Sequence, residues 1–331
     1  MYRIALLPGD GIGREVIPEA ARLLKCTGIG FEFNHVEVGY DVFKLHGTSV
    51  PDEAVESIRE NDACLFGATT TPIGVNDYRS AIVTLRRALN VYANVRPAKS
   101  YPVPGVRPNV DLVVVRENTE GLYSGIEYGN DDSAFTVRVI TREATERVAR
   151  FAFQLAMKRR RKVTLATKAN IMRKTCGLFR TVSLEVAEEY PEVEVQQLNI
   201  DVAAMHMVMK PEAYDIILAP NLFGDILSDE SAGLVGGLGL APSANIGENF
   251  ALFEPVHGSA PDIAGKGIAN PTAAVLSVKL MLDYLGEVEW AQRLERAVAD
   301  VLSNGTVFTP DLGGRASTVE MVDAFITAMG L

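Results

Sequence analysis

With 331 residues, the chain is longer than one hydrophobic core usually serves, so we expect two domains. Its formal net charge of −10 argues against nucleic acid as a general partner. Residues 1–8 read as a short strand rather than a targeting signal, and no apolar stretch approaches the length that crosses a bilayer. Three separated cysteines, Cys26, Cys64 and Cys176, form no C-x-x-C pair and predict buried thiols in a reducing compartment. Together these features predict a cytoplasmic protein.

Short β-branched runs alternate with amphipathic stretches along the whole chain. The pattern predicts strands at 3–8, 63–66, 110–116, 163–167 and 214–219, and helices at 14–25, 141–157, 272–285, 288–302 and 318–329. Strands that alternate with helices imply an α/β fold with a largely parallel sheet. The Gly-, Asn- and Asp-rich stretch at 128–133 predicts a hairpin turn or an arm that reaches away from the body.

Two motifs resemble binding signals but have simpler explanations. Gly9-Asp10-Gly11-Ile12-Gly13 follows a strand and opens a helix, but its spacing is one residue short of the dinucleotide-binding G-x-G-x-x-G loop. A tight turn between strand and helix is therefore the alternative to a nucleotide loop. The basic run Lys158-Arg159-Arg160-Arg161-Lys162 follows an apolar series with helical spacing, so we place it at a helix C-terminus, where cations complement the macrodipole.

A pair of acids gives a stronger signal for chemistry. Asp225 and Asp229 are four residues apart in Asn221-Leu222-Phe223-Gly224-Asp225-Ile226-Leu227-Ser228-Asp229, at an expected helix start. This spacing stacks both carboxylates on one helical face, which is unfavourable unless a cation lies between them. A hard divalent ion such as Mg²⁺ or Mn²⁺ would satisfy that requirement. The alternative is a pair of acids that complement the helix macrodipole.

Further candidate side chains stand near the ends of expected strands and helices. Lys168 directly follows the strand at 163–167, where α/β proteins place their chemistry, and a depressed pKa would make it a base. Tyr123 lies shortly beyond another strand end, and its alternative is a packed aromatic with a solvated hydroxyl. Arg86, Arg96 and Arg116 suggest a pocket for a dianion, because the planar guanidinium binds carboxylates through two hydrogen bonds.

These residues belong to an ordered set of motifs that extends over nearly the whole chain. The set comprises Gly9-Asp10-Gly11-Ile12-Gly13, Tyr92-Ala93-Asn94-Val95-Arg96-Pro97, Arg116-Glu117-Asn118-Thr119-Glu120-Gly121, Lys168-Ala169-Asn170, the acid motif above, and the segment that runs from Glu254-Pro255-Val256-His257-Gly258 to Ala269-Asn270-Pro271. In this set the chain resembles the β-decarboxylating dehydrogenases that act on 3-isopropylmalate, homoisocitrate, isocitrate and tartrate or D-malate.

The resemblance implies a fold and a domain arrangement. The expected fold is the isopropylmalate/isocitrate dehydrogenase fold, which is α/β but not a Rossmann fold. A discontinuous cofactor domain would comprise residues 1–91 and 236–331. An inserted domain of residues 92–235 would carry the substrate and metal residues, the dimer interface and an arm.

The resemblance also implies where the cofactor binds. His257, Gly258, Ala260 and Asn270 would surround the adenosine of NAD, with Asp262 on the ribose hydroxyls and Ile263 beside it. An anionic residue at that place repels a 2′-phosphate, so NAD is expected rather than NADP. Relatives that use NADP have a basic residue and a tyrosine at the positions of Asp262 and Ile263.

The same resemblance implies roles for the candidate side chains. Arg86, Arg96 and Arg116 would hold the malate carboxylates, and Asp225 and Asp229 would bind Mg²⁺ or Mn²⁺ together with Asp201 of the partner subunit. Lys168, also from the partner, would take the hydroxyl proton through water or Asp201 as hydride leaves for NAD, and Tyr123 would protonate the enolate carbon. Shared sites imply a homodimer at least, and a tetramer remains open.

The segment 79–86 is expected to read the variable arm of the substrate. Ile82 and Val83 offer an apolar surface, with Ser80 beside them, and this favours 3-isopropylmalate and leucine biosynthesis. Arg79 could instead bind a distal carboxylate, which keeps homoisocitrate (lysine biosynthesis) as the alternative and isocitrate as the third candidate. A non-catalytic regulatory subunit is an alternative of another class. We expect an enzyme, because the chain keeps the lysine, the tyrosine and all three aspartates.

Overall fold

The computed structural model describes residues 1–75 and 77–331. Its centre is a ten-stranded sheet with the order β2-β1-β3-β12-β11-β4-β5-β10-β8-β9. The strands are β1 (Tyr2–Gly9), β2 (Phe31–His35), β3 (Ala63–Ala68), β4 (Ala93–Lys99), β5 (Asp111–Glu117), β8 (Lys162–Thr167), β9 (Glu194–Asn199), β10 (Ile216–Ala219), β11 (Pro242–Ile246) and β12 (Ala251–Pro255). Pairing is parallel toward both edges but antiparallel from β12 through β11 and β4 to β5. The α/β fold and the largely parallel sheet are therefore confirmed.

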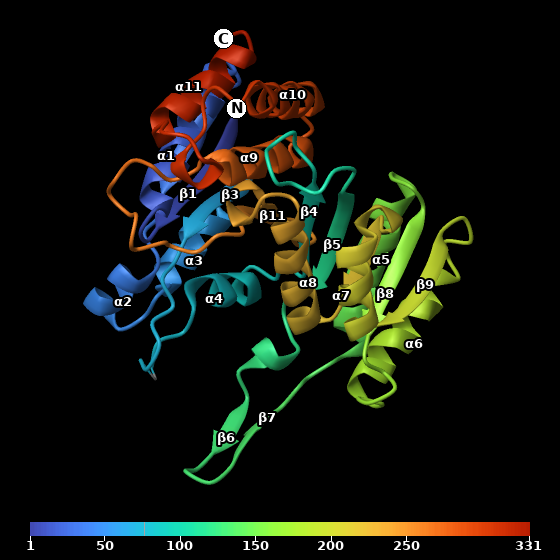
Figure 1. Ribbon diagram of the computed structural model, residues 1–331. Helices are drawn as coiled ribbons and strands as arrows, with labels where there is room; N and C mark the ends of the chain where they lie inside the picture. The colour runs from blue at the N-terminus through green and yellow to red at the C-terminus, as the bar shows by residue number, and fades with distance from the viewer. Residues whose placement is uncertain (76) are drawn as a thin grey trace.

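Helices cover both faces of the sheet (Figure 1). They are α1 (Gly13–Cys26), α2 (Tyr40–His46), α3 (Asp52–Arg59), α4 (Ala81–Ala88), α5 (Arg142–Met157), α6 (Thr175–Ala187), α7 (Ile200–Met209), α8 (Asn221–Leu234), α9 (Thr272–Tyr284), α10 (Val288–Asn304) and α11 (Thr318–Ala328). One hydrophobic core extends along a whole face, under α1, α5, α6 and α9–α11. The opposite face has two smaller cores, one under α3 and α4 and the other under α7 and α8.

The predicted strands and helices are confirmed to within about two residues at their ends, and Tyr214 precedes β10 rather than belonging to it. The hairpin is also confirmed: β6 (Glu127–Gly129) pairs with β7 (Ala134–Thr136) in an exposed arm that extends far from the body (Figure 1). The basic run does follow a helix end, and Arg159 Nε also binds the buried carboxylate of Asp215 at 2.8 Å.

One prediction about the thiols is wrong. Cys64 and Cys176 are buried, but Cys26 is exposed. Cys26 is the last residue of α1, two positions beyond Leu24, the last residue that this helix buries. No helix in the described part of the chain is long and apolar enough to cross a membrane.

The proposed division into two domains falls within the central sheet. The segments 1–91 and 236–331 contribute one end of the sheet, and residues 92–235 contribute the other. Antiparallel pairing of β11 with β4 joins them, with Asn245 opposite Asn94. The domain boundaries themselves stay a prediction.

The glycine motif after β1 is a tight turn that packs against the segment following β12. A Cβ atom at Gly11, which has φ +57°, would lie 2.0 Å from the carbonyl oxygen of Ser259. The amide of Ile12 donates a 2.9 Å hydrogen bond to that same oxygen. Asp10 is buried and accepts hydrogen bonds from the amides of Tyr40 and Thr70. The motif therefore fixes the segment around Ser259.

We expect Gly11→Ala to destabilise the fold by about 1–3 kcal/mol more than Gly28→Ala. Both glycines have positive φ, so both variants bear the strain of alanine in that region, but only Gly11 has a backbone oxygen in the way. Gly28 has nothing within 4 Å of the added Cβ and is the matched control. Urea unfolding of both variants measures the difference, and equal losses would contradict the packing role of Gly11.

Candidate active site

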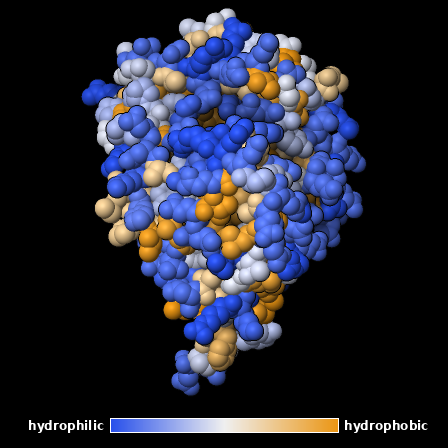
Figure 2. Space-filling view, turned by 90° about the vertical axis from the view of Figure 1, so that its right-hand side faces the viewer, coloured by the Kyte–Doolittle hydropathy of each residue, from blue (hydrophilic) through white to orange (hydrophobic). Residues whose placement is uncertain are grey.

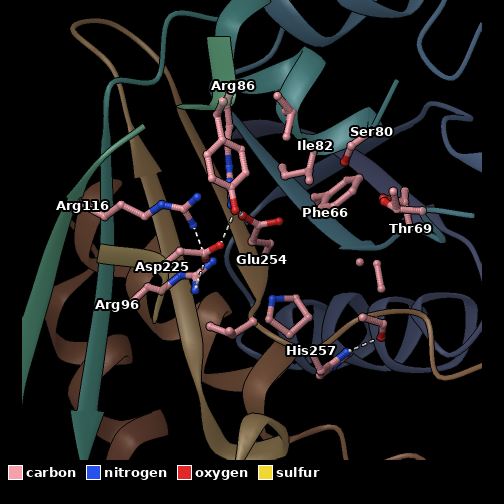
Figure 3. Close-up of a pocket in the computed structure, with 18 residues that line it drawn as sticks. Phe66, Thr69, Ser80, Ile82, Arg86, Arg96, Arg116, Asp225, Glu254 and His257 are labelled. Atoms are coloured by element: carbon pink, nitrogen blue, oxygen red, sulfur yellow. Dashed lines mark hydrogen bonds and ion pairs between the residues drawn. The ribbon is translucent and has the colours of Figure 1, made fainter. Parts of the chain in front are cut away.

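A cavity of about 220 Å³ opens in the middle of the sheet face, between the two smaller cores (Figure 3). Polar residues occupy this part of the face, because alternate residues of β4, β5, β11 and β12 turn polar side chains toward it while their neighbours join the large core. The cavity is lined by Phe66, Gly67, Ala68, Thr69, Thr71, Ser80, Ile82, Val83, Arg86, Arg96, Arg116, Tyr123, Asp225, Glu254, Pro255, Val256, His257 and Gly258.

The structure brings the three predicted arginines together in this cavity. Arg86 lies in the last turn of α4, Arg96 in the middle of β4, and Arg116 near the end of β5. Their exposed fractions are 6%, 8% and 1%. Charged side chains are rarely buried this deeply unless they are paired. Each therefore needs a compensating group.

Protein groups supply part of that compensation. Arg86 Nη2 donates to Glu254 at 2.9 Å, and both Nε and Nη2 of Arg116 donate to Asn221. Nη1 of Arg116 forms an ion pair with Asp225. Burial, reinforced by repulsion from the neighbouring arginines, lowers the pKa of Arg116 to about 9 and also lowers that of Arg96. An added anion would therefore be stabilised here.

Free donors remain for such an anion. Nη1 of Arg86 and Nη2 of Arg96 have no hydrogen-bond partner within residues 1–75 and 77–331, and Nε of Arg96 is buried without one. Unpaired donors on two buried guanidiniums are what a carboxylate-binding pocket requires.

Asp225 and Asp229 lie on one face of α8, as predicted. Their alternative role at the helix N-terminus is not supported, because the first turn of α8 contains no acid and both residues lie beyond it. The cation between them is Arg96, whose Nη1 is 3.2 Å from Asp225 and 3.0 Å from Asp229. Although burial opposes it, Arg116 and Arg96 hold the pKa of Asp225 below its usual range, whereas burial raises that of Asp229.

The donor set fits a hard divalent ion but is incomplete in one chain. The oxygen atoms of two carboxylates are suitable ligands for Mg²⁺ or Mn²⁺. Among the residues that the structure describes, no cluster of three or more acids, histidines or cysteines has metal-binding geometry. A third acidic ligand would have to come from elsewhere, as the expectation for Asp201 requires.

Tyr123 projects into the same cavity from a short 3₁₀ turn, Leu122–Ser124. Its hydroxyl donates to Asp225 at 2.5 Å, and the guanidinium of Arg116 lies 4.9 Å from its ring centre. Burial and the hydrogen bond to Asp225 raise the pKa of Tyr123, which keeps the hydroxyl protonated. It is therefore available as a proton donor.

Lys168 and Asp201 lie together but outside this cavity. Lys168 follows β8, Asp201 lies in the first turn of α7, and the two form an ion pair that lowers the pKa of Asp201. Neither lines the cavity that holds the arginines. Within one chain, Tyr123 thus lines the cavity of the arginines, whereas Lys168 lies outside it.

The predicted specificity residues divide between the cavity and the surface. Ser80, Ile82 and Val83 line the cavity, whereas Arg79 is exposed and does not. Sequence reasoning missed Phe66, Thr69, Thr71 and Glu254, which also line it. A signal was available for the threonines, because Thr69-Thr70-Thr71 directly follows β3, at the carboxyl end of a buried strand.

The predicted cofactor residues lie beside the cavity and beyond it. His257 and Gly258 line it, and burial lowers the pKa of His257, which keeps the ring neutral. A second cavity of about 410 Å³ is lined by Ile12, Gly239, His257, Ile263, Ile268, Asn270, Pro310 and Asp311. Ala260 has a positive φ of 39°, and Asp262, which precedes Ile263 in the chain, is exposed. His257 thus connects the two cavities.

Comparisons with known proteins agree on the family. The family model "Isocitrate/isopropylmalate dehydrogenase" matches residues 3–325. An "Isocitrate/homoisocitrate dehydrogenase" of Thermus thermophilus is 56% identical over 99% of this chain and 98% of its own. A "3-isopropylmalate/3-methylmalate dehydrogenase" of Methanocaldococcus jannaschii is 50% identical over 98% and 97%. The crystal structure of isocitrate dehydrogenase from Methylococcus capsulatus is 46% identical, with a TM-score of 0.96 over all of both chains.

We expect Arg96→Met to lower the free energy of unfolding by about 3–5 kcal/mol, because it leaves two partly buried carboxylates without their shared cation. Arg22→Met is the matched control. Arg22 also bridges two acids, Glu19 and Asp323, but at the surface, where such pairs contribute about 0–1 kcal/mol. Equal small losses in urea unfolding of the two variants would show that the acids of α8 do not depend on Arg96.

Proposed function

Because the chain belongs to the isocitrate/isopropylmalate dehydrogenase family, we propose that it oxidises and decarboxylates a tricarboxylic hydroxy acid, homoisocitrate or isocitrate, with NAD and Mg²⁺ or Mn²⁺. Its full-length agreement with solved relatives confirms the expected fold. As a member it is an NAD-dependent β-decarboxylating dehydrogenase, and the alternative of a non-catalytic subunit has no support. One observation carries the proposal: three buried arginines, Asp225 and Tyr123 line one cavity, and Asp229 is held beside it by Arg96.

The walls of the cavity support a tricarboxylate. Thr69, Thr71 and Ser80 bring three hydroxyl groups to it, and Figure 3 shows Ser80 and Thr69 on the same side as Ile82. A distal carboxylate would accept hydrogen bonds from such hydroxyls, whereas an isopropyl arm would leave them unpaired. The relative at 56% identity bears the name of an isocitrate/homoisocitrate dehydrogenase. Both observations reverse the order that Ile82 and Val83 alone suggest.

3-Isopropylmalate remains the second candidate. Ile82 and Val83 do line the cavity and offer an apolar surface to a branched arm. The relative named as a 3-isopropylmalate/3-methylmalate dehydrogenase is 50% identical to this chain. In this second proposal the pathway would be leucine rather than lysine biosynthesis.

The residues of the cavity would divide the work between binding and proton transfer. The free donors of Arg86 and Arg96, with Arg116 beside them, would hold the carboxylates of the malate part. Asp225 and Asp229, with Asp201 of the partner subunit, would hold the divalent ion, which supplies Lewis-acid polarisation of the substrate oxygen. The guanidinium of Arg96, which lies between Asp225 and Asp229 in this structure, would be displaced by the ion or would share the two carboxylates with it.

Two proton transfers frame the reaction. Lys168 of the partner subunit would accept the proton of the substrate hydroxyl, through water or Asp201. Hydride would pass to the nicotinamide from the carbon that bears this hydroxyl. The resulting oxo acid loses its β-carboxylate as CO₂, and the bonding electrons form an enolate. Tyr123, which the raised pKa keeps protonated, would donate a proton to the enolate carbon.

A homodimer with shared sites, located in the cytoplasm, would complete this set. Exposed apolar side chains support this dimer. On α7 and α8 four of them are 48–57% exposed, namely Met205, Val208, Met209 and Ile226, and the arm exposes Tyr128 and Phe135. Figure 2 shows apolar side chains gathered on the lower part of one face and along the narrow arm below it. Exposed apolar groups in one area favour a protein interface.

The cofactor would lie along the second cavity. His257, Gly258, Ala260, Ile263 and Asn270 would surround the adenosine. Asp262 would bind the ribose hydroxyls, and its negative charge favours NAD over NADP. Asp311, which accepts a 2.9 Å hydrogen bond from Asn270, adds a second anion on that side.

Steady-state kinetics on homoisocitrate, isocitrate and 3-isopropylmalate tests the proposal, with NAD or NADP and with Mg²⁺ or EDTA. We expect the highest kcat/KM for a tricarboxylate with NAD, a loss of turnover in EDTA, and recovery on adding Mg²⁺ or Mn²⁺. A misfit of the arm typically costs about 1–3 kcal/mol, or roughly ten- to two-hundredfold in kcat/KM. Preference for 3-isopropylmalate would establish the second candidate, and full activity in EDTA would remove the metal from the account.

A further inference from the structure

We propose that Asn245 is a positioning residue that fixes the guanidinium of Arg86 and ties it to the strands that carry Arg96 and Arg116. Asn245 lies in β11, is fully buried, and lines neither the cavity of the arginines nor that of the proposed cofactor site. No motif in the sequence analysis gave it a role. Its inference rests on the proposed function, since Arg86 is assigned there to the substrate carboxylates.

The side-chain amide of Asn245 is the centre of a polar network. Its Oδ1 accepts hydrogen bonds from Arg86 Nε at 3.1 Å and from Nδ2 of both Asn94 and Asn118 at 2.9 Å. Its Nδ2 donates to Glu254 Oε1 at 2.8 Å and to the carbonyl of Leu252 at 3.2 Å. The amide orientation is therefore determined, because all three partners of the oxygen are donors and both partners of the nitrogen are acceptors.

The network fixes the plane of the Arg86 guanidinium. Glu254 binds Nη2 of Arg86, and Asn245 binds both Nε of Arg86 and the same oxygen of Glu254. Two hydrogen bonds at different nitrogens hold a planar fork in one orientation, whereas one alone would let it pivot. Asn245 thereby directs the remaining amino group of Arg86, Nη1, which has no partner in the described residues.

Strand register extends this control to a second arginine. Asn245 pairs with Asn94 across β11 and β4, and Asn94 pairs with Arg116 across β4 and β5. Paired residues turn their side chains to the same face, so the three lie in one row. Asn118 follows Arg116 by two residues and returns to the same amide oxygen. Asn245 thus sets the spacing between Arg86 on one side of the β11–β4 junction and Arg116 on the other.

A double-mutant comparison with Arg86 tests this role. We expect Asn245→Ala to raise KM for the preferred hydroxy acid about ten- to hundredfold, with kcat and KM for NAD changed much less, because a carboxylate clamp acts on bound substrate and transition state alike. Lysine has no Nε donor that forms this bond. In an Arg86→Lys background, Asn245→Ala should therefore add less than about twofold to KM.

Ser243→Ala is the matched control. Ser243 is also fully buried in β11 and binds Nδ2 of Asn94, but it does not contact Arg86. It should destabilise the protein without raising KM. If Asn245→Ala does not fold, Asn245→Ser, which keeps an acceptor oxygen on a shorter side chain, should show a smaller rise in KM with the same dependence on Arg86.

Three results would overturn the role. These are an unchanged KM in both Asn245 variants, an equal rise in Ser243→Ala, and a rise that is undiminished in the Arg86→Lys background. Each presupposes an active wild-type enzyme. Wild-type protein that turns over none of the three acids would instead refute the proposed function.

Discussion

Three guanidinium groups buried on one face of a sheet are the constraint on which the rest of the site depends. Charged side chains are not buried without compensation, and here they also repel one another. Glu254, Asn221 and Asp225 provide partners, and α8 lies directly on Arg116, where a Cβ at Gly224 would come within 2.6 Å of the arginine side chain. Much of the cavity wall therefore consists of groups that pair with these guanidiniums while leaving some of their N–H donors free.

The sequence predicted some of the elements that build the site, such as β5 with Arg116, and missed others, namely β4, β11 and β12. The strand at 3–8 contains the apolar run from Ile4 to Leu7, and the strand at 163–167 is short and rich in β-branched and apolar residues, so both could be recognised. β4 and β11 carry Asn94, Arg96 and Asn245 instead, and strands with polar residues on one face have no such run. Their positions near the ends of expected elements singled out the three arginines and Tyr123, and the motif resemblance then gave them roles. The row that aligns Asn245 with Arg116 depends on strand register, which no single strand encodes.

In the proposed mechanism, one chain alone does not supply a complete site. The arginines, Asp225 and the tyrosine line the cavity, and Asp229 is paired with Arg96 beside it, whereas the only base proposed, Lys168, pairs with Asp201 away from it. In a dimer with a twofold axis, the Lys168–Asp201 pair of each chain could complete the cavity of the partner chain, because every contact across such an interface occurs twice. Exposed apolar side chains on α7, beyond Asp201, agree with an interface beside that pair. Neither the acid pair nor the lysine would then function in a monomer.

Activity of mixed dimers tests the shared site most directly. Lys168→Met and Asp225→Asn should each be nearly inactive, because one lacks the base and the other a metal ligand. After unfolding and refolding of an equal mixture, half the dimers carry one variant of each kind, and one of their two sites is intact. The account therefore predicts recovery of about a quarter of wild-type turnover. A mixture no more active than its components, despite shown exchange of subunits, would contradict it.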